Sequence, residues 1–311
     1  MNSLKSRVES MLRHLVVGDA LGKICSKYTK EEVYSLYGKP ITGLVKPIRR
    51  NSNQEWFRGA VTDDTILTLL VADSLINRGS FDRRDLARRL IDCEPRGGKQ
   101  IYKLKKSGNE DYVASDGETN GAAIRVSPLA VVETDLEELT TETISLSTLT
   151  HGSNEAITSA LLVVYTLSLT LHEKQVSLET LDKNLLELYP ESEKTVVRKN
   201  LRKAFSIAER EDIENLSDIM EDAVGFYKEA WSSIPTAIVL GLFSKENFRE
   251  IQSIIHRNKP MGDLDSVASV AGSIMGAKRH NLEIEDISKE IEIMNSFSIK
   301  YYAHKLLGLR W

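Results

Sequence analysis

Two short acidic clusters lie far apart in the chain, and each directly precedes an apolar run with helical spacing. The first is Thr62-Asp63-Asp64-Thr65 and the second is Gly262-Asp263-Leu264-Asp265-Ser266. Both offer carboxylate and hydroxyl oxygens with no Cys or His beside them. Hard oxygen donors of this kind suit Mg²⁺ or Mn²⁺ rather than Zn²⁺. The residue types therefore indicate a divalent-cation site formed by two distant segments.

Helix capping is the alternative interpretation of each cluster taken alone. Asp and Thr are common N-cap residues, and acidic residues in a first turn are stabilised by the helix dipole. Together the clusters supply four carboxylates and two hydroxyls, on Asp63, Asp64, Asp263, Asp265, Thr62 and Ser266. If the two helix starts face each other, these like charges raise one another's pKa, and divalent cations would neutralise them. Two metal ions about 3.5–4 Å apart can orient a substrate's oxygens and activate a water molecule.

The composition is that of an ordinary globular protein. The 311 residues are 41% hydrophobic and 28% charged, and no segment is of low complexity. The 41 basic and 45 acidic residues are spread along the chain and give a net charge of −4, so no overall field attracts nucleic acid or an anionic membrane. We therefore expect neither general nucleic-acid binding nor a membrane surface as a partner.

The cysteine count and the apolar segments predict a cytoplasmic protein. Cys25 and Cys93 are the only cysteines, which favours a reducing compartment over a disulfide scaffold. The first twenty residues place apolar and charged side chains at helical spacing, unlike a secretion signal. The most apolar run, from Ala160 to Leu171, is too short and too polar to span a bilayer, so we expect a core helix there.

Helical periodicity dominates the sequence and predicts an all-α fold, with residues 1–311 in a single domain. The one strand candidate, from Ile41 to Ile48, is weak. We expect the first helix to end around Gly18 and Gly22. A loop-rich stretch should then continue to about Gly59.

Several later helices have recognisable ends. Thr62 is the expected N-cap of a helix that stops at Gly79, and Ser153 the expected N-cap of a helix from Asn154 to Leu171. Pro235 suits the first turn of a short helix through Leu242, after which Ser244 can cap the next. The helix from Val267 to Ala277 is rich in Ala, Gly and Ser. Such small residues let neighbouring helix backbones approach closely, which would place the second acidic cluster at the centre of the bundle.

Five polar motifs follow one another along the chain. They are Gly18-Asp19-Ala20-Leu21-Gly22, Thr62-Asp63-Asp64-Thr65, Asn120-Gly121-Ala122-Ala123-Ile124-Arg125-Val126-Ser127-Pro128, Thr150-His151 and Gly262-Asp263-Leu264-Asp265-Ser266. Their order and spacing resemble those of the ADP-ribosylglycohydrolase family, over residues 11 to about 280. The resemblance implies a compact orthogonal bundle of many helices. It also implies a binuclear Mg²⁺ site, with Mn²⁺ as a substitute.

The resemblance also implies roles for individual residues. The metal ligands would be Thr62, Asp63, Asp64, Asp263, Asp265 and Ser266. The catalytic residues would be Asp63, Asp64 and Asp265. The substrate-binding residues would be Asp19, Ser115, Gly117, Asn120, Gly121, Arg125 and His151, with the loop from Ser115 to Gly121 receiving the pyrophosphate. Three of these have a structural alternative: Asp19 could cap a turn, Arg125 could form a salt bridge to a neighbouring helix, and His151 could cap or pack.

A few positions depart from the family pattern. Ser26 stands where many relatives carry a glutamate, and Thr119 replaces a glycine of the phosphate loop. Met261, Leu264 and Ser266 differ from the usual second acidic motif, although Ser266 keeps a hydroxyl ligand. These changes would reshape the pocket and point to a different substrate.

The resemblance implies a Mg²⁺-dependent hydrolase that cleaves the N- or O-glycosidic bond between ADP-ribose and a protein side chain, and so reverses ADP-ribosylation. Hydrolysis of a small ADP-ribosyl or ribosyl conjugate is one alternative. A second is a non-enzymatic binder or immunity protein that occludes an ADP-ribosyltransferase partner, although the intact set of ligands argues against it. A plain helical scaffold with capping aspartates would follow only if the two acidic clusters did not converge in space.

Overall fold

The computed structural model describes residues 3–48, 56–93, 99–210, 216–244, 247–256, 262–279 and 282–310. Within these ranges the regular structure is helical and no strand forms, apart from an isolated bridge between Thr119 and Glu229. The all-α prediction is therefore confirmed. The strand expected from Ile41 to Ile48 is wrong. Two apolar residues of that segment, Ile41 and Leu44, are buried in an irregular loop instead.

The α-helices are, in chain order, α1 (Leu4–Cys25), α2 (Lys30–Tyr37), α3 (Asp63–Arg78), α4 (Arg83–Asp92), α5 (Lys99–Ser107), α6 (Gly121–Ile124), α7 (Leu129–Val132), α8 (Leu136–Ser147), α9 (Asn154–Leu171), α10 (Leu178–Leu188), α11 (Val196–Ala208), α12 (Leu216–Ala223), α13 (Ala230–Phe243), α14 (Asn247–Ile255), α15 (Leu264–Lys278), α16 (Leu282–Asn295) and α17 (Ile299–Leu307). A short 3₁₀ helix, η1 (Pro190–Lys194), precedes α11. The prediction of a single domain over the whole chain stays a prediction.

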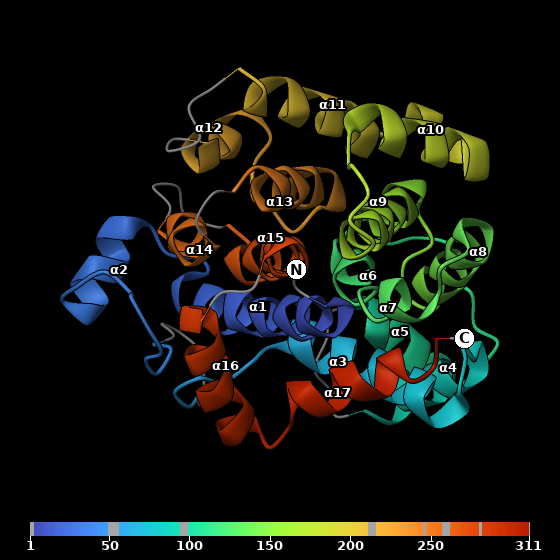
Figure 1. The fold of residues 1–311 in the computed structure, drawn as a ribbon, viewed down its shortest axis with the longest axis horizontal. Coiled ribbons are helices and arrows are strands. Elements are labelled where there is room, and N and C mark those ends of the chain that lie inside the picture. Colours follow the sequence, from blue (N-terminus) through green and yellow to red (C-terminus); the bar gives the residue numbers. More distant parts are fainter. Residues whose placement is uncertain are drawn as a thin grey trace.

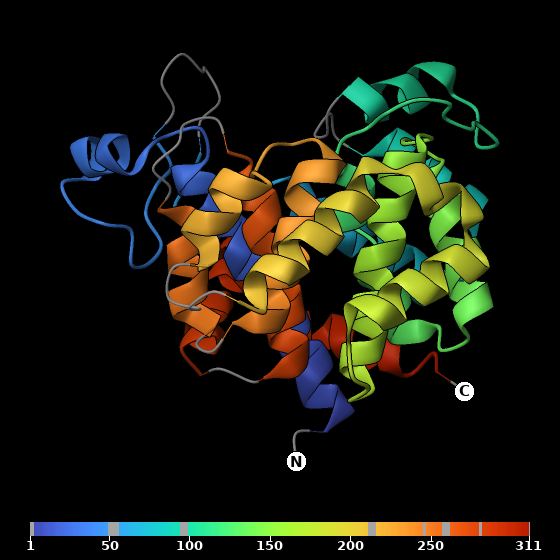
Figure 2. The ribbon, with the colours of Figure 1, turned by 90° about the horizontal axis from the view of Figure 1, so that it is seen from above.

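Helices α1 and α15 form the centre of the bundle. They pack against each other over most of their length, and nearly every residue of α15 is buried (Figure 1). Outward from α15 lie α13 and then α11, while α16 and α17 cover the opposite side of α1. Seen from above, the two chain termini lie on one side of the bundle, and α5 with the turn after it lies on the other (Figure 2).

Two glycines allow α1 and α15 to approach closely. A Cβ atom at Gly18 would overlap the carbonyl oxygen of Ala268, and one at Gly22 would lie 2.5 Å from the Cα of Asp265. The expected end of the first helix at these glycines is wrong, because α1 continues to Cys25. The glycines are there because two backbones touch, a tertiary cause that leaves the helix unbroken.

The helix starts that carry polar motifs agree with the sequence. Helix α3 has Thr62 as N-cap, whose Oγ1 accepts from the Asp64 amide at 3.1 Å, and it ends at Gly79 with φ of 83°. Helix α9 begins after its N-cap Ser153 and ends at Leu171, as expected. Among the described residues α9 is also the one helix long and apolar enough to cross a membrane. Because 83% of that stretch is buried inside the protein, it is packed as a core helix would be.

Helix α13 begins earlier than expected and contains Pro235 in its interior. A proline cannot donate to the carbonyl four residues before it, here that of Trp231. The Asn200 side chain of α11 donates to that carbonyl at 2.7 Å and so fills the vacancy. Ser244 is the C-cap of α13 rather than the N-cap of the next helix. The two residues before α14 lie outside the described residues.

Two short helices were not expected from the sequence, and the first of them lies in the stretch expected to be loop-rich. Helix α2 has a complete capping box, in which Thr29 and Glu32 each accept from the other's backbone amide. This local signal was present in the sequence. Helix α5 is amphipathic, with Ile101 and Leu104 buried among lysines.

We predict that Gly18→Ala destabilises the protein by about 3 kcal/mol, because a methyl group there meets the backbone of α15 and outweighs the gain of about 1 kcal/mol that Ala brings to a helix. Gly43→Ala is the control, since a Cβ atom at Gly43 has open space around it. The free energy of unfolding in urea measures both. Equal stability of the two variants would contradict the close crossing.

Candidate active site

The two acidic clusters meet in space. Ser266, in the first turn of α15, donates through Oγ to Oδ2 of Asp64, in the first turn of α3, at 2.9 Å. The starts of α3 and α15 therefore face each other beside the second half of α1. The plain scaffold interpretation, which required that the clusters stay apart, is wrong.

Asp19 connects α1 to the start of α3. Its Oδ2 accepts from the amides of Thr62 and Thr65 at 2.9 and 3.2 Å, and from the Thr65 hydroxyl at 2.6 Å. Asp19 thus satisfies two backbone amides at the start of α3, and its role in substrate binding stays a prediction. Its other oxygen, Oδ1, is buried with no hydrogen-bond partner in the described part of the chain. Burial raises the pKa of Asp19 to about 6, against the lowering effect of the Thr65 hydrogen bond.

Negative charge accumulates around Asp64. Burial raises the pKa of Asp64, and four neighbouring carboxylates raise it further: those of Asp63, Asp19, Asp265 and Asp263. Burial and then the charge of Asp265 raise the pKa of Asp263 to about 7, although Asn120 donates to its Oδ2 at 2.7 Å. The five carboxylates would repel one another if all were ionised, so this arrangement favours protons or cations among them.

Two side chains from α1 hold the carboxylate of Asp265. Ser26 donates to Oδ1 at 2.8 Å, and the Lys23 ammonium lies 3.3 Å from Oδ2. The same ammonium lies 4.8 Å from the centre of the Trp56 ring. Sequence reasoning missed Lys23. Its spacing could have found it, because Lys23 is one helical turn after Asp19 and therefore faces the same side of α1.

The oxygen atoms at the site are of the chemical type that binds a hard divalent cation. They are carboxylates with Thr62 and Ser266 hydroxyls, and the orphaned Oδ1 of Asp19 has no other partner among the described residues. In the same residues no three acidic, His or Cys side chains are already arranged around one point. Asp265 is instead bonded to Lys23 and Ser26, so cation binding at that carboxylate would replace these contacts.

The loop before α6 lies against the acidic side chains. Asn120 donates to Asp263 and also to the Ser233 hydroxyl at 3.1 Å. Gly117 has φ of 104°, which only glycine adopts readily, and its carbonyl accepts from Ser153. Ser115, by contrast, is exposed and its side chain makes no hydrogen bond with the described residues. Gly121 is the first residue of α6. Because α6 has a single turn, its dipole is weak, and it would attract a phosphate less than a long helix would.

Arg125 and His151 are buried behind this loop. Arg125 donates to the Thr150 hydroxyl and forms no ion pair with any described residue, so the alternative of a salt bridge to a neighbouring helix is wrong. Burial lowers the pKa of Arg125 to about 10, while the charge of Asp63 acts to raise it. His151 lies between the hydroxyls of Thr150 and Thr119, at 2.7 and 2.8 Å. Burial and the charge of Arg125 lower the pKa of His151 to about 3, so it is neutral.

Two of the residues that depart from the family pattern contact site residues, and a third is buried beside the second acidic motif. Ser26 and Thr119 both touch the site, through Asp265 and His151 respectively. Leu264 is buried and packs beside Gly262. Met261 lies outside the described residues.

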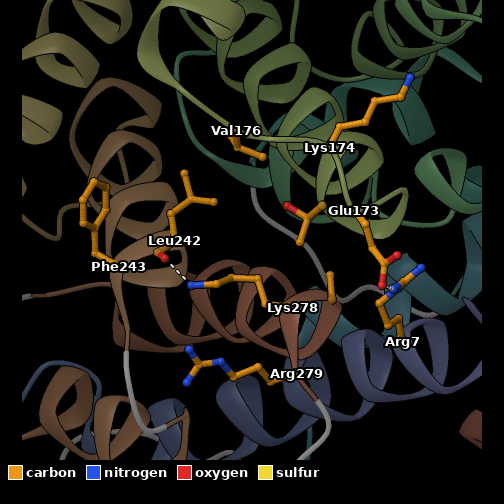
Figure 3. Close-up of a pocket in the computed structure, with 10 residues that line it drawn as sticks. Arg7, Glu173, Lys174, Val176, Leu242, Phe243, Lys278 and Arg279 are labelled. Atoms are coloured by element: carbon orange, nitrogen blue, oxygen red, sulfur yellow. Dashed lines mark hydrogen bonds and ion pairs between the residues drawn. The ribbon is translucent and has the colours of Figure 1, made fainter. Parts of the chain in front are cut away.

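A cavity of about 510 Å³ lies at the end of the α1–α15 pair that is away from the acidic side chains. Its lining includes the cations of Arg7, Lys174, Lys278 and Arg279. Figure 3 shows Lys278 reaching to the end of α13, where its ammonium donates to the carbonyl of Leu242. Helices α9, α13 and α15 all end at this cavity, and cations are favourable at helix C-termini. The helix ends thus account for the positive charge.

Known proteins share this fold and sequence pattern. A profile of the ADP-ribosylglycohydrolases matches residues 1–283. The chain is 23% identical to YegU of Escherichia coli, over 98% of this chain and 97% of that protein. It is 24% identical to the ADP-ribosylarginine hydrolase Tri1 of Pseudomonas putida, over 87% of this chain and 70% of Tri1. A solved ADP-ribosylglycohydrolase-related protein complex matches the full length of both chains with a TM-score of 0.70 and 20% identity.

A helical bundle with facing acidic helix starts and a matching family profile defines a glycosidic-bond hydrolase. The chain belongs to the ADP-ribosylglycohydrolase family, so the resemblance seen in its sequence is confirmed. Membership of this family indicates an enzyme that hydrolyses a glycosidic bond.

We predict that Asp263→Asn stabilises the protein at high pH in the presence of a chelator. Because the folded state raises the pKa of Asp263 from 3.8 to about 7, the stability contributed by its proton is complete below pH 4 and lost as the pH rises toward 7. Asn carries no charge and still accepts from Asn120. Relative to the wild type, the variant should gain about 4 kcal/mol between pH 4 and pH 8.

Unfolding in urea across this pH range measures the difference. The matched control is Asp286→Asn, because Asp286 is highly exposed on α16. If the difference in unfolding free energy between the Asp263 variant and the wild type stays constant with pH, the folded protein does not raise the pKa of Asp263.

Proposed function

We propose that this protein is a Mg²⁺-dependent hydrolase that removes ADP-ribose from a protein side chain. The observation that carries the proposal is the convergence of five carboxylates with the Thr62 and Ser266 hydroxyls at two helix starts. Tri1, a relative that matches most of this chain, is named for its action on ADP-ribosylarginine. An ADP-ribosyltransferase that supplies the modified protein would be the functional counterpart of this activity.

In this proposal Thr62, Asp63 and Asp64 hold two Mg²⁺ ions from α3, and Asp263, Asp265 and Ser266 hold them from α15, with Mn²⁺ as a substitute. When bound, such ions orient ribose hydroxyls and stabilise negative charge on oxygen. They would also remove the mutual repulsion that raises the pKa of Asp64. Bound cations would therefore explain why so many acidic side chains lie together at this site.

The carboxylates also supply the proton transfer that hydrolysis requires. Water adds to the anomeric carbon, the bond from that carbon to the side-chain nitrogen or oxygen breaks, and the departing atom takes a proton. Asp63, Asp64 and Asp265 are the residues we assign to this step. A carboxylate close to the anomeric carbon can take a proton from the attacking water and return one to the departing atom.

Hydrolysis of a small ADP-ribosyl conjugate is the second candidate. The choice depends on how wide the rim of the site is, and Lys23 and Trp56 stand at that rim. Part of the same loop, residues 49–55, lies outside the described residues. We place the activity in the cytoplasm, because a chain with only two cysteines is typical of a reducing compartment.

We predict that Asp63→Ala and Asp265→Ala each lower kcat/KM by at least about 100-fold, because each removes a ligand and a proton acceptor. Release of ADP-ribose is measured from arginine-linked, serine-linked and small-molecule conjugates, with and without Mg²⁺. Asp286→Ala is the exposed control and should retain full activity. Activity that survives both site substitutions would overturn the metal mechanism.

We predict that Lys23→Met tightens Mg²⁺ binding by about tenfold, because the Lys23 ammonium competes with the metal for Oδ2 of Asp265 and repels it. Calorimetric titration with Mg²⁺ at neutral pH measures the affinity. Lys30→Met is the matched control, since Lys30 is exposed at the start of α2. Unchanged or weaker binding in the Lys23 variant would show that this ion pair does not oppose the metal.

A further inference from the structure

Helix α5 has a basic face that is turned away from the core. Its apolar residues Ile101 and Leu104 are buried, and the helix contains no acidic residue. Residues at helical spacing share the opposite side and form what we call the α5 face: Lys99, Tyr102, Lys103 and Lys106. The Tyr102 side chain, in the middle of this face, is 63% exposed. The α5 face thus combines an aromatic ring with positive charge.

The charges of the α5 face differ from those of two other surface helices. On α10, Lys183 pairs with Glu187, and on α16, Lys289 pairs with Glu285. Pairs of opposite sign one turn apart are typical of a helix face that meets only water. Helix α5 has no carboxylate of its own to form such a pair. Its lysines therefore repel one another along the helix.

The acidic residues near α5 leave most of this charge unbalanced. Asp116 faces the helix: Lys103 donates to its carboxylate and lowers its pKa, and the charge of Lys99 lowers it further. Lys99 and Lys106 are exposed and form no ion pair with any described residue. The two acidic residues that follow α5 in the chain, Glu110 and Asp111, are bonded to arginines of α4 instead. A single carboxylate cannot balance the three lysines of the face.

The α5 face lies beside the acidic site but outside it. The Gln100 side chain of α5 packs on Gly117, where a Cβ atom would lie 3.0 Å from the Gln100 amide. Three residues later in the same loop, Asn120 donates to Asp263. Figure 2 shows α5 on the side of the bundle opposite the N-terminus, and the site lies beside the second half of α1, away from that terminus. A polypeptide whose side chain enters the site would therefore pass close to α5.

We propose that the α5 face is a docking surface for an acidic segment of the ADP-ribosylated protein. The inference rests on the proposed function, which brings a polypeptide chain to the rim of the site. Carboxylates of that segment would meet the ammonium groups of α5, and such complementary charges speed encounter and fix orientation. Tyr102 adds an exposed aromatic ring, a residue type enriched in protein interfaces.

A nucleic acid is a poorer fit to this face. Nucleic-acid affinity rises with the number of phosphates that lysines and arginines neutralise. The α5 face is one short helix with three lysines, on a chain whose net charge is −4. An acidic peptide needs only a few carboxylates to match it.

The test compares two synthetic peptides that carry the same ADP-ribosylated arginine or serine, whichever the full-length protein cleaves. Glutamates flank the modified residue in one peptide, and glycines and serines flank it in the other. The wild type should cleave the glutamate peptide with a kcat/KM about tenfold higher, and added NaCl should reduce this preference by screening the charges. Lys99→Glu combined with Lys106→Glu should abolish the preference, leaving kcat/KM for the neutral peptide within about twofold of the wild type. Glutamine at the same two positions should give an intermediate loss.

The matched control lies on α17, the helix next to the C-terminus. Lys300→Glu combined with Lys305→Glu makes the same change in net charge beside an exposed tyrosine, Tyr301. This variant should cleave both peptides as the wild type does. All four lysines are exposed, so circular dichroism should show the wild-type fold in both variants.

The outcomes separate the docking surface from the proposed function. If the wild type cleaves the two peptides equally well, or if the α5 and α17 variants lose the preference equally, the docking surface is wrong and the proposed function stands. An equal loss on both peptides in the α5 variant would also overturn the docking surface, because the lysines would then act on the ADP-ribose that the peptides share.

Two further results would contradict the inference. A short single-stranded RNA that binds the wild type but not the α5 variant, with no difference between the peptides, would identify nucleic acid as the occupant. If the wild type cleaves neither peptide with either linkage, the proposed function fails and the docking surface fails with it.

Discussion

The close approach of α1 and α15 is the constraint on which the site depends. Because Gly18 and Gly22 carry no side chain, the backbone of α15 rests directly on α1, and Asp265 comes within reach of Lys23 and Ser26. The same approach sets Asp19 against the start of α3. A wider crossing would separate the carboxylates and leave each to solvent. The helix packing thus brings the carboxylates close enough to repel one another, and the proposed cation binding depends on this concentration of negative charge.

The repulsion between the carboxylates is reduced by neutral and cationic side chains that contact them. Lys23 pairs with Asp265, Asn120 with Asp263, and Ser266 with Asp64. Each contact stabilises one ionised carboxylate, yet the pKa values of Asp19 and Asp263 remain raised. The site is therefore stable enough to fold and still short of positive charge. On the far side of the bundle the signs are reversed, since Lys278 and its cationic neighbours gather where helices end.

Local signals in the sequence were enough to predict the fold class, the capped starts of α3 and α9, and the two acidic clusters. They failed where the cause lies in another part of the chain. Glycine alone does not reveal a touching backbone, so the sequence predicts a helix end at Gly18 and Gly22. It predicts a helix start at Pro235 because the donor that replaces the missing amide comes from α11. The burial of Arg125 against a hydroxyl, rather than a carboxylate, depends on the same kind of long-range packing. The capping box of α2 and the spacing of Lys23 were readable and were overlooked.

The pairing of Asn200 with the vacancy that Pro235 leaves in α13 has an evolutionary consequence. The proline is tolerated because a neighbouring helix completes the hydrogen bond that it cannot make. The two positions are therefore epistatic. A lineage that lost the Asn200 amide while keeping Pro235 would leave a partly buried carbonyl without its donor, whereas one that first replaced the proline would be free to change Asn200 afterwards. The order in which α11 and α13 can diverge is thus limited by a single side chain that lies outside the site.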